Sequence, residues 1–364
     1  MRKYTRLLPA ALVLTGLLLT SCGRAAAHEK ETGAAPVKNT PVPAAAVSAP
    51  EETAASVLPA AEPTGDQAGK FVLPYDEMAQ PRFHLSPDGT LAGILSSKRL
   101  YVFHTSPFKP AYTIDTPAGA GNFAFSADGN LGAITPGTQQ SVQLFDARSG
   151  TFTRVLEGGR LASNLLLFSG DGSKLAVVLD FSTVELWEAA DGKYMGWLMI
   201  QGDSGKIGLN TNGEVLSKTG NLFYTRTGEP VPSDNWMHSQ GTIFTPLGLC
   251  IRTVADLKPG FVVAHGPDFE SPVPGISISP ASAHLVVSSA DEGLVAVANA
   301  KEVQIADVYA GKILKKDVIE VRGSDPSILI LDIAFAADGT LIELVQESGQ
   351  NEFAFYTREV KPRE

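Results

Sequence analysis

The chain has 364 residues, which is long enough for two average domains or for one large repeat domain. Hydrophobic residues make up 44% of it and charged residues 19%, so a sizeable buried core is expected. The formal net charge of −10 argues against a nucleic-acid partner, because Lys and Arg must neutralise the phosphates. The same acidity gives no general attraction to an anionic membrane surface, so any membrane attachment requires a specific anchor.

The first 21 residues have the layout of an export signal. Arg2, Lys3 and Arg6 form a positive start, and an apolar run of 13 residues follows from Leu7 to Leu19. Such a run is too short to span a bilayer comfortably, and it matches the core of a secretory signal peptide. We therefore predict that residues 1–21 are a signal peptide.

The signal ends in Leu19-Thr20-Ser21-Cys22, which resembles the lipobox of bacterial lipoproteins. In that family the cysteine receives a diacylglycerol, the signal is cut just before it, and the new amino terminus is often acylated with a fatty acid such as palmitate. The resemblance implies that Cys22 carries a lipid that anchors the protein in the cell envelope. The alternative is an ordinary signal peptide with an incidental cysteine.

Two further residues bear on the anchor. The second cysteine, Cys250, lies in an apolar stretch that suits a small buried side chain better than a disulfide. Gly23 follows Cys22 where some bacteria place an Asp that retains lipoproteins in the inner membrane. The resemblance therefore favours the outer membrane over the inner membrane.

Residues 22–69 are predicted to be a lipidated cysteine followed by a disordered tether. The stretch from Gly23 to Gly69 contains no aromatic residue and is rich in Ala and Pro. It has neither the period of a strand nor that of a helix, and it cannot bury enough apolar surface to offset its ordering entropy. Repeated Pro keeps such a segment extended, so we interpret it as a spacer between the membrane and a folded domain.

The remainder of the chain contains an internal repeat. Each copy has an apolar strand, a tight turn and a second apolar strand. The turns fall at Asp88-Gly89, Asp128-Gly129, Asp171-Gly172, Asn212-Gly213, Asp291-Glu292-Gly293 and Asp338-Gly339. Asp-Gly and Asn-Gly between apolar runs are strong hairpin signals, because these residues accept the positive φ of such turns. The turns are 40, 43, 41, 79 and 47 residues apart, and 79 is two steps of about 40. We assign a degenerate copy to residues 242–264, which gives seven repeats.

A third strand follows each turn and often ends in an aromatic residue and an acid, as in Phe145-Asp146 and Trp187-Glu188. The period, the Ser-x-Asp-Gly turn and this ending resemble WD40-like and YVTN-type propellers. The resemblance implies an all-β, seven-bladed β-propeller with four-stranded antiparallel blades over residues 70–364. We predict that Lys70–Pro74 supplies the missing outer strand of the last blade, since that pairing removes a sheet edge. The alternative is that these residues only end the linker.

No catalytic residue, metal site or cofactor is predicted. The six histidines have no metal-ligand spacing, and no Gly-x-Ser-x-Gly elbow or phosphate-binding loop occurs. The repeated Asp residues are explained by turns. Residues 190–197 resemble a single quinoprotein repeat.

The sequence indicates protein contacts more strongly than catalytic or metal sites. Trp236 and Met237 end a polar, Pro-rich segment, and such side chains are favoured at interfaces. Further candidates are Phe108 with Tyr112, and Phe269; the alternative for each is packing within the fold. We therefore expect a non-enzymatic interaction platform for an envelope protein of unknown identity. The alternative is a small-molecule-binding or hydrolytic propeller that uses its central channel. An apolar channel with an exposed aromatic patch at the rim would favour the platform.

Overall fold

The structure is a computed structural model. It describes residues 67–79, 81–116, 120–136, 141–157, 165–179, 183–200, 207–218, 221–230, 239–247, 250–254, 261–265, 276–277, 285–291, 293–307, 312–318, 329–347 and 351–360. All of them belong to the compact unit Asn39–Glu364. The predicted signal peptide and nearly all of the predicted tether, with Cys22, lie outside the described residues.

Antiparallel sheets follow one another along the chain, as the repeat predicts. The first three comprise β2 (Arg82–Leu85), β3 (Leu91–Leu95), β4 (Arg99–Thr105) and β5 (Phe108–Asp115); β6 (Ala120–Phe125), β7 (Leu131–Pro136), β8 (Ser141–Asp146) and β9 (Phe152–Glu157); and β10 (Leu165–Phe168), β11 (Lys174–Val178), β12 (Thr183–Glu188) and β13 (Tyr194–Met199). A shorter sheet follows, with β14 (Ile207–Leu209), β15 (Val215–Lys218) and β16 (Asn221–Tyr224).

Three more sheets complete the described part of the chain. They comprise β17 (Ser239–Phe244), β18 (Cys250–Val254), β19 (Phe261–His265) and β20 (Ile276–Ser277); β21 (Leu285–Ser288), β22 (Leu294–Ala298), β23 (Glu302–Asp307) and β24 (Lys312–Val318); and β25 (Leu329–Phe335), β26 (Leu341–Gln346), β27 (Glu352–Arg358) and β1 (Gln67–Val72). A short 3-10 helix, η1 (Tyr75–Glu77), follows β1.

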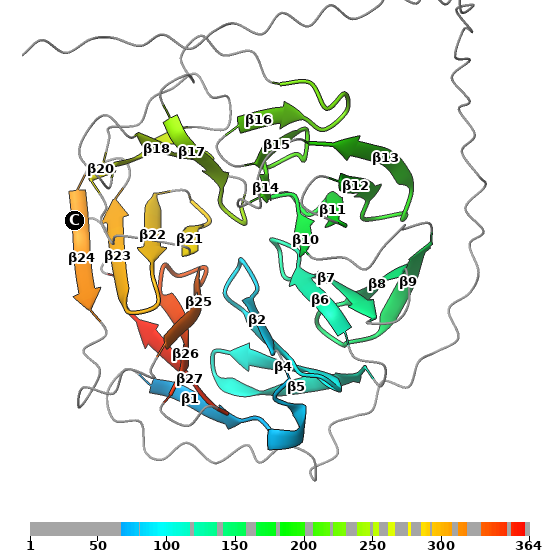
Figure 1. Cartoon of the computed structure of the whole chain (residues 1–364). Coiled ribbons are helices and arrows are strands. Elements are labelled where there is room, and N and C mark those ends of the chain that lie inside the picture. Colours follow the sequence, from blue (N-terminus) through cyan, green and yellow to red (C-terminus); the bar gives the residue numbers. More distant parts are fainter. Residues whose placement is uncertain are drawn as a thin grey trace, which may run out of the picture. The chain divides into compact units, whose positions relative to one another are not determined.

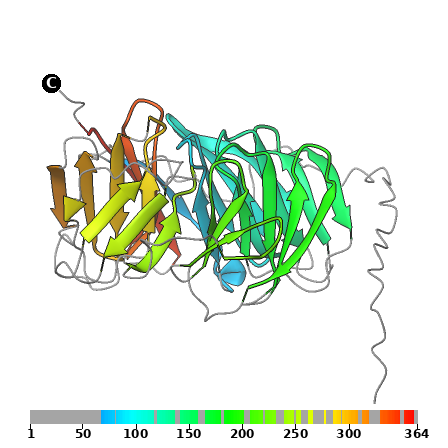
Figure 2. The ribbon, with the colours of Figure 1, turned by 90° about the horizontal axis from the view of Figure 1, so that it is seen from above.

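The sheets are arranged around a common centre (Figure 1), with the first strand of each repeat innermost. Strands β25, β2, β6, β10, β14 and β17 pack against one another in this order, and β21 packs against β25. Figure 2 shows the strands of the sheets running between the two faces of this arrangement. Four-stranded antiparallel sheets grouped in this way form a β-propeller, and the predicted fold class is confirmed at that level.

The predicted number of complete blades is wrong. Six sheets have four strands among the described residues, whereas the sheet β14–β16 has three. Beyond β16, a single bridge joins Phe223 to Pro230. Proline has no amide hydrogen, so Pro230 cannot donate a hydrogen bond to β16 at this bridge. The degenerate repeat at residues 242–264 does form strands, which are the second half of β17, β18 and all of β19 but its last residue.

The predicted pairing that gives the last blade its outer strand is confirmed for Lys70–Val72. Strand β1 pairs antiparallel with β27, with Phe71 opposite Phe353, and begins at Gln67, slightly before the expected start of the domain. Phe71 is fully buried, and its ring lies 4.8 Å from that of Phe103 in the neighbouring sheet. The Lys70 ammonium adds ion pairs to Glu347 at 2.8 Å and Glu352 at 2.5 Å.

The turns explain why one motif recurs. Between β6 and β7, Ser126 Oγ donates to Asp128 Oδ1 at 2.6 Å and accepts the Leu131 amide at 2.9 Å. Gly129 has a φ of +64°, which the absence of a side chain permits. Ser86, Ser169 and Ser289 repeat these contacts. Apolar layers between successive sheets then form the core.

Candidate functional sites in the central channel and on strand β13

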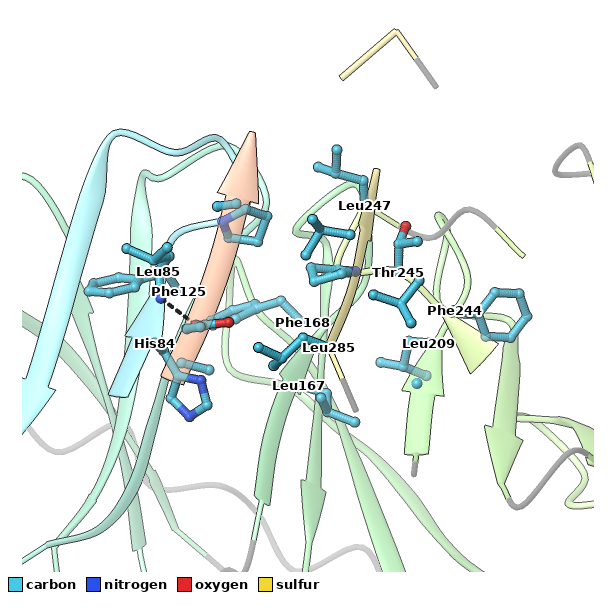
Figure 3. A pocket seen from close by; sticks show the side chains of 18 of the residues that line it. His84, Leu85, Phe125, Leu167, Phe168, Leu209, Phe244, Thr245, Leu247 and Leu285 are labelled. Atoms are coloured by element: carbon cyan, nitrogen blue, oxygen red, sulfur yellow. Dashed lines mark hydrogen bonds between the residues drawn. The ribbon is translucent and has the colours of Figure 1, made fainter. Parts of the chain in front are cut away.

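The innermost strands surround a cavity of about 320 Å³ (Figure 3). Its wall is mainly apolar, because the innermost strands turn aliphatic and aromatic side chains toward it. Representative lining residues, contributed by different sheets, are Leu85, Phe125, Phe168, Leu209, Leu247 and Leu285. Cavities of this size and lining hold small molecules in many proteins. This is the channel in which the small-molecule alternative would place its site.

Among the described lining residues, His84 and Asp332 are the titratable ones. His84 lies edge-on to Phe123, with 5.0 Å between the ring centroids. Burial lowers the pKa of His84 to about 4, although the Asn122 side chain partly offsets this. The imidazole is therefore neutral near pH 7.

Asp332 connects two sheets inside the channel. Its Oδ2 accepts the amide of Leu85 at 2.8 Å, and its Oδ1 accepts the amide of Ile333 at 2.9 Å. Figure 3 draws the first of these bonds as a dashed line. Burial raises the pKa of Asp332 to about 7, and the two backbone amides offset only part of that effect. A carboxyl group with a pKa near 7 changes charge in the physiological range.

Two hydroxyl groups lie elsewhere on the wall. Thr245 Oγ1 and Ser288 Oγ are 2.9 Å apart, and both residues are buried. They link the end of β17 to β21. Within the described part of the chain, no group of three His, Cys, Asp or Glu residues could hold a metal ion.

A second candidate site lies on β13, the outermost strand of its sheet. Its sequence is Tyr-Met-Gly-Trp-Leu-Met, and most of its large side chains are exposed. Trp197 is 49% exposed and Met199 is 60% exposed, whereas Leu198 between them is buried in the core. The pairing with β12 contains a bulge near Gly196, which has a φ of +135°. Bulges bend a strand and redirect its side chains, so this one helps to set the exposed face.

A groove of about 690 Å³ runs from β13 to the turn that follows β16. Tyr194, Trp197 and Tyr224 contribute aromatic rings to it, and Met195 contributes a thioether. Charged side chains of both signs surround these apolar groups: Lys174, Lys193, Arg226, Glu188, Glu214 and Glu229. Lys174 Nζ donates to the carbonyl of Asn212 at 2.8 Å and so joins the two sheets across the groove.

Two of the predicted contact residues are described, and both pack within the fold. Tyr112 is buried against the next sheet, and its hydroxyl donates to the carbonyl of Ala147 at 2.6 Å. Phe108 is half-buried, with its ring stacked on Phe103 and 4.7 Å from that of Phe355. A role for either residue in contacting a partner stays a prediction.

The other predicted sites, Trp236, Met237 and Phe269, lie outside the described residues, as does Cys22. The sequence did not predict the exposed side chains of β13 as a contact surface, since residues 190–197 resemble a quinoprotein repeat. The signal was present in the composition of the strand. Large apolar side chains occupy consecutive positions 194–195 and 197–199, so one face of the strand cannot bury them all.

The described residues include no helix long and apolar enough to cross a membrane. No protein-family model matches the chain. No curated protein matches it either.

Proposed function

We propose that this protein is a non-enzymatic interaction platform, held in the cell envelope by a lipid on Cys22 and docking a partner protein on β13. The observation that carries the proposal is the exposed patch formed by Tyr194, Met195, Trp197, Met199 and Tyr224, which we call the β13 patch. Soluble proteins usually bury such side chains, and contiguous exposed groups of them mark interaction surfaces.

The composition of the β13 patch resembles the centre of a protein interface. Trp, Tyr and Met are enriched there, and truncating a central aromatic residue commonly costs more than 1 kcal/mol of binding free energy. The surrounding charges of both signs resemble a polar rim. The partner that fits is a protein with an extended segment whose apolar side chains can enter the groove between Trp197 and Tyr224.

The lipid anchor rests on the sequence. The lipobox residues supply the attachment cysteine, and two or more acyl chains hold a protein stably at a membrane. We expect Cys22→Ser to move the protein from the membrane fraction to the soluble fraction and to abolish its metabolic labelling with palmitate. A variant that stays membrane-bound and labelled would contradict the anchor.

The incomplete sheet belongs to the same proposal. We infer that β14–β16 takes the place of a seventh blade, since β14 packs between β10 and β17 as an innermost strand. The turn that follows β16 forms one wall of the groove, so this sheet also contributes to the proposed docking surface.

A capture experiment tests the platform. The full chain is crosslinked in envelope membranes, and a Trp197→Ala, Met199→Ala double variant is compared with wild type. We expect the double variant to lose at least one protein that wild type captures. Tyr75→Ala is the matched control, because Tyr75 is 78% exposed and is not among the residues that line the groove.

The control should retain the full set of captured proteins. If the double variant folds and captures the same proteins as wild type, the β13 patch is not the docking surface. The cavity beside Asp332 is the observation that favours the small-molecule alternative.

A further inference from the structure

We propose that the central channel binds a small molecule with an apolar body and a protonated amine, with the Asp332 carboxylate as the partner of the amine. This inference goes beyond the platform and does not depend on the β13 patch. It rests on the shape and lining of the cavity, on the way Asp332 is held, and on the charges around it.

The cavity suits an apolar body. Its volume of about 320 Å³ lies at the lower end of the range for ligand pockets. Leucine and phenylalanine side chains from several sheets line it, so a ring or short hydrocarbon group would bury apolar surface against them. Figure 3 shows Leu85 and Phe125 on one side of the cavity and Thr245 and Leu247 on the other.

Asp332 is positioned as a recognition group. The two backbone amides that it accepts fix the orientation of its carboxylate on the wall. Each carboxylate oxygen can accept about two hydrogen bonds, so both retain capacity after these contacts. Its raised pKa follows from burial, and no cation among the described residues lowers it. A ligand ammonium would supply the missing opposite charge in a site where water screens it poorly.

The charged groups on the strands that pack against β25, the strand of Asp332, are consistent with a cationic ligand. On β2, His84 is neutral near pH 7, and Arg82 is exposed at the start of the strand. On β26, Glu343 is already paired with Arg358, whose Nε lies 2.6 Å from its Oε1. The described segments of β21 and β22 that pack on β25 carry no titratable side chain. The acidic net charge of the chain also favours a cation.

The test uses three probes of matched size and different charge: cyclohexylamine, cyclohexanol and cyclohexanecarboxylate. Binding to the full chain in non-ionic detergent is measured by isothermal titration calorimetry. We expect cyclohexylamine to bind saturably, and the other two to bind at least about tenfold more weakly, as loss of a charged hydrogen bond implies.

The pH dependence gives a second readout. A group with a pKa near 7 is about one-tenth ionised at pH 6 and about nine-tenths ionised at pH 8. We therefore expect cyclohexylamine to bind about tenfold more tightly at pH 8 than at pH 6. Cyclohexanol, which is neutral, should show no such change.

Two variants distinguish recognition from a purely structural role. Asp332→Asn should remove the preference for the amine over the alcohol while leaving cyclohexanol binding in place. Leu167→Trp, which enlarges a half-buried lining residue, should weaken all three probes and leave the pH dependence of any residual binding unchanged.

Three results would overturn the proposal. These are equal binding of amine and alcohol, an amine preference that survives Asp332→Asn, or no saturable binding of any probe to folded wild type. None of them bears on the β13 patch, so failure here leaves the platform proposal intact.

Discussion

At the scale of single residues, a buried serine hydroxyl organises four of the turns. Ser126 is fully buried and holds both the Asp128 carboxylate and the Leu131 amide. The Asp carboxylate in turn accepts the Asn130 amide at 3.1 Å. One hydroxyl therefore satisfies a backbone donor and orients a side-chain acceptor, which explains why Ser and Asp recur together.

We predict that Ser126→Ala lowers the free energy of unfolding by about 1–3 kcal/mol, because it removes the hydrogen bonds of a buried hydroxyl to the half-buried Leu131 amide and to the Asp128 carboxylate. Chemical unfolding followed by tryptophan fluorescence measures this. The turn at Asp338 has Ala336 in the serine position. Ala336→Ser should therefore be neutral or stabilise by up to about 1 kcal/mol. A Ser126→Ala variant as stable as wild type would show that the hydroxyl is dispensable.

The raised pKa of Asp332 gives stability a specific pH dependence. Its folded pKa of about 7 lies above its ordinary value of 3.8, so unfolding releases a proton between these values. The contribution of Asp332 to the free energy of unfolding is largest below pH 4 and falls as the pH rises toward 7. Above pH 7 it stays at its lowest value. His84 has the opposite slope, because its lowered pKa of about 4 costs stability as pH falls from 6.5.

We therefore predict that Asp332→Asn becomes more stable relative to wild type as pH rises from 4 to 7. Comparing the two proteins cancels the effect of His84. Urea unfolding at pH 4, 5.5 and 7 measures the difference. A difference that does not change over this range would contradict the raised pKa.

At the scale of strands, the two ends of the described domain are joined by β1. It pairs with β27. Beyond the strand, the Leu73 amide donates to the Asn351 carbonyl at 2.9 Å, and Asn351 Nδ2 donates to the Leu73 carbonyl at 2.9 Å. Phe71 fills the layer between this sheet and the next. An N-terminal strand that completes a C-terminal blade removes an edge that would otherwise be free to pair with other chains.

We predict that Phe71→Ala destabilises the protein by about 3–5 kcal/mol, as expected for a large aromatic side chain removed from a core. Tyr75→Ala, a few residues away and largely exposed, should change stability by about 0.5 kcal/mol or less. Thermal unfolding of the full chain measures both. Similar small effects of the two changes would contradict the closure by β1.

The strands were largely predictable from the sequence, because each repeat carries its own turn chemistry. Asp88-Gly89 and Asn212-Gly213 set hairpins locally, and the pairing of Lys70–Val72 followed from counting the strands of the last repeat. The three-stranded sheet was not predicted. The period of about 40 residues predicts the position of a repeat, but it does not predict how many of its strands pair among the described residues.

At the scale of the whole molecule, the chain combines a predicted lipid anchor, a predicted spacer and a propeller with an exposed outer strand. The candidate sites were less predictable than the fold. A channel is lined by residues from distant repeats, so no local spacing marks Asp332. Exposure depends on the neighbouring sheet, which explains why Tyr112 is buried while Trp197 is not.

Site-specific photocrosslinking tests the platform most directly. A photoreactive amino acid replaces Met199 in the full chain, and cells are irradiated while the envelope is intact. A second protein carries the same amino acid at Tyr75, which is even more exposed. We predict a defined crosslinked protein from position 199 and none of that mass from position 75. If position 199 gives no crosslink, or both positions give the same products, the β13 patch is not a docking surface.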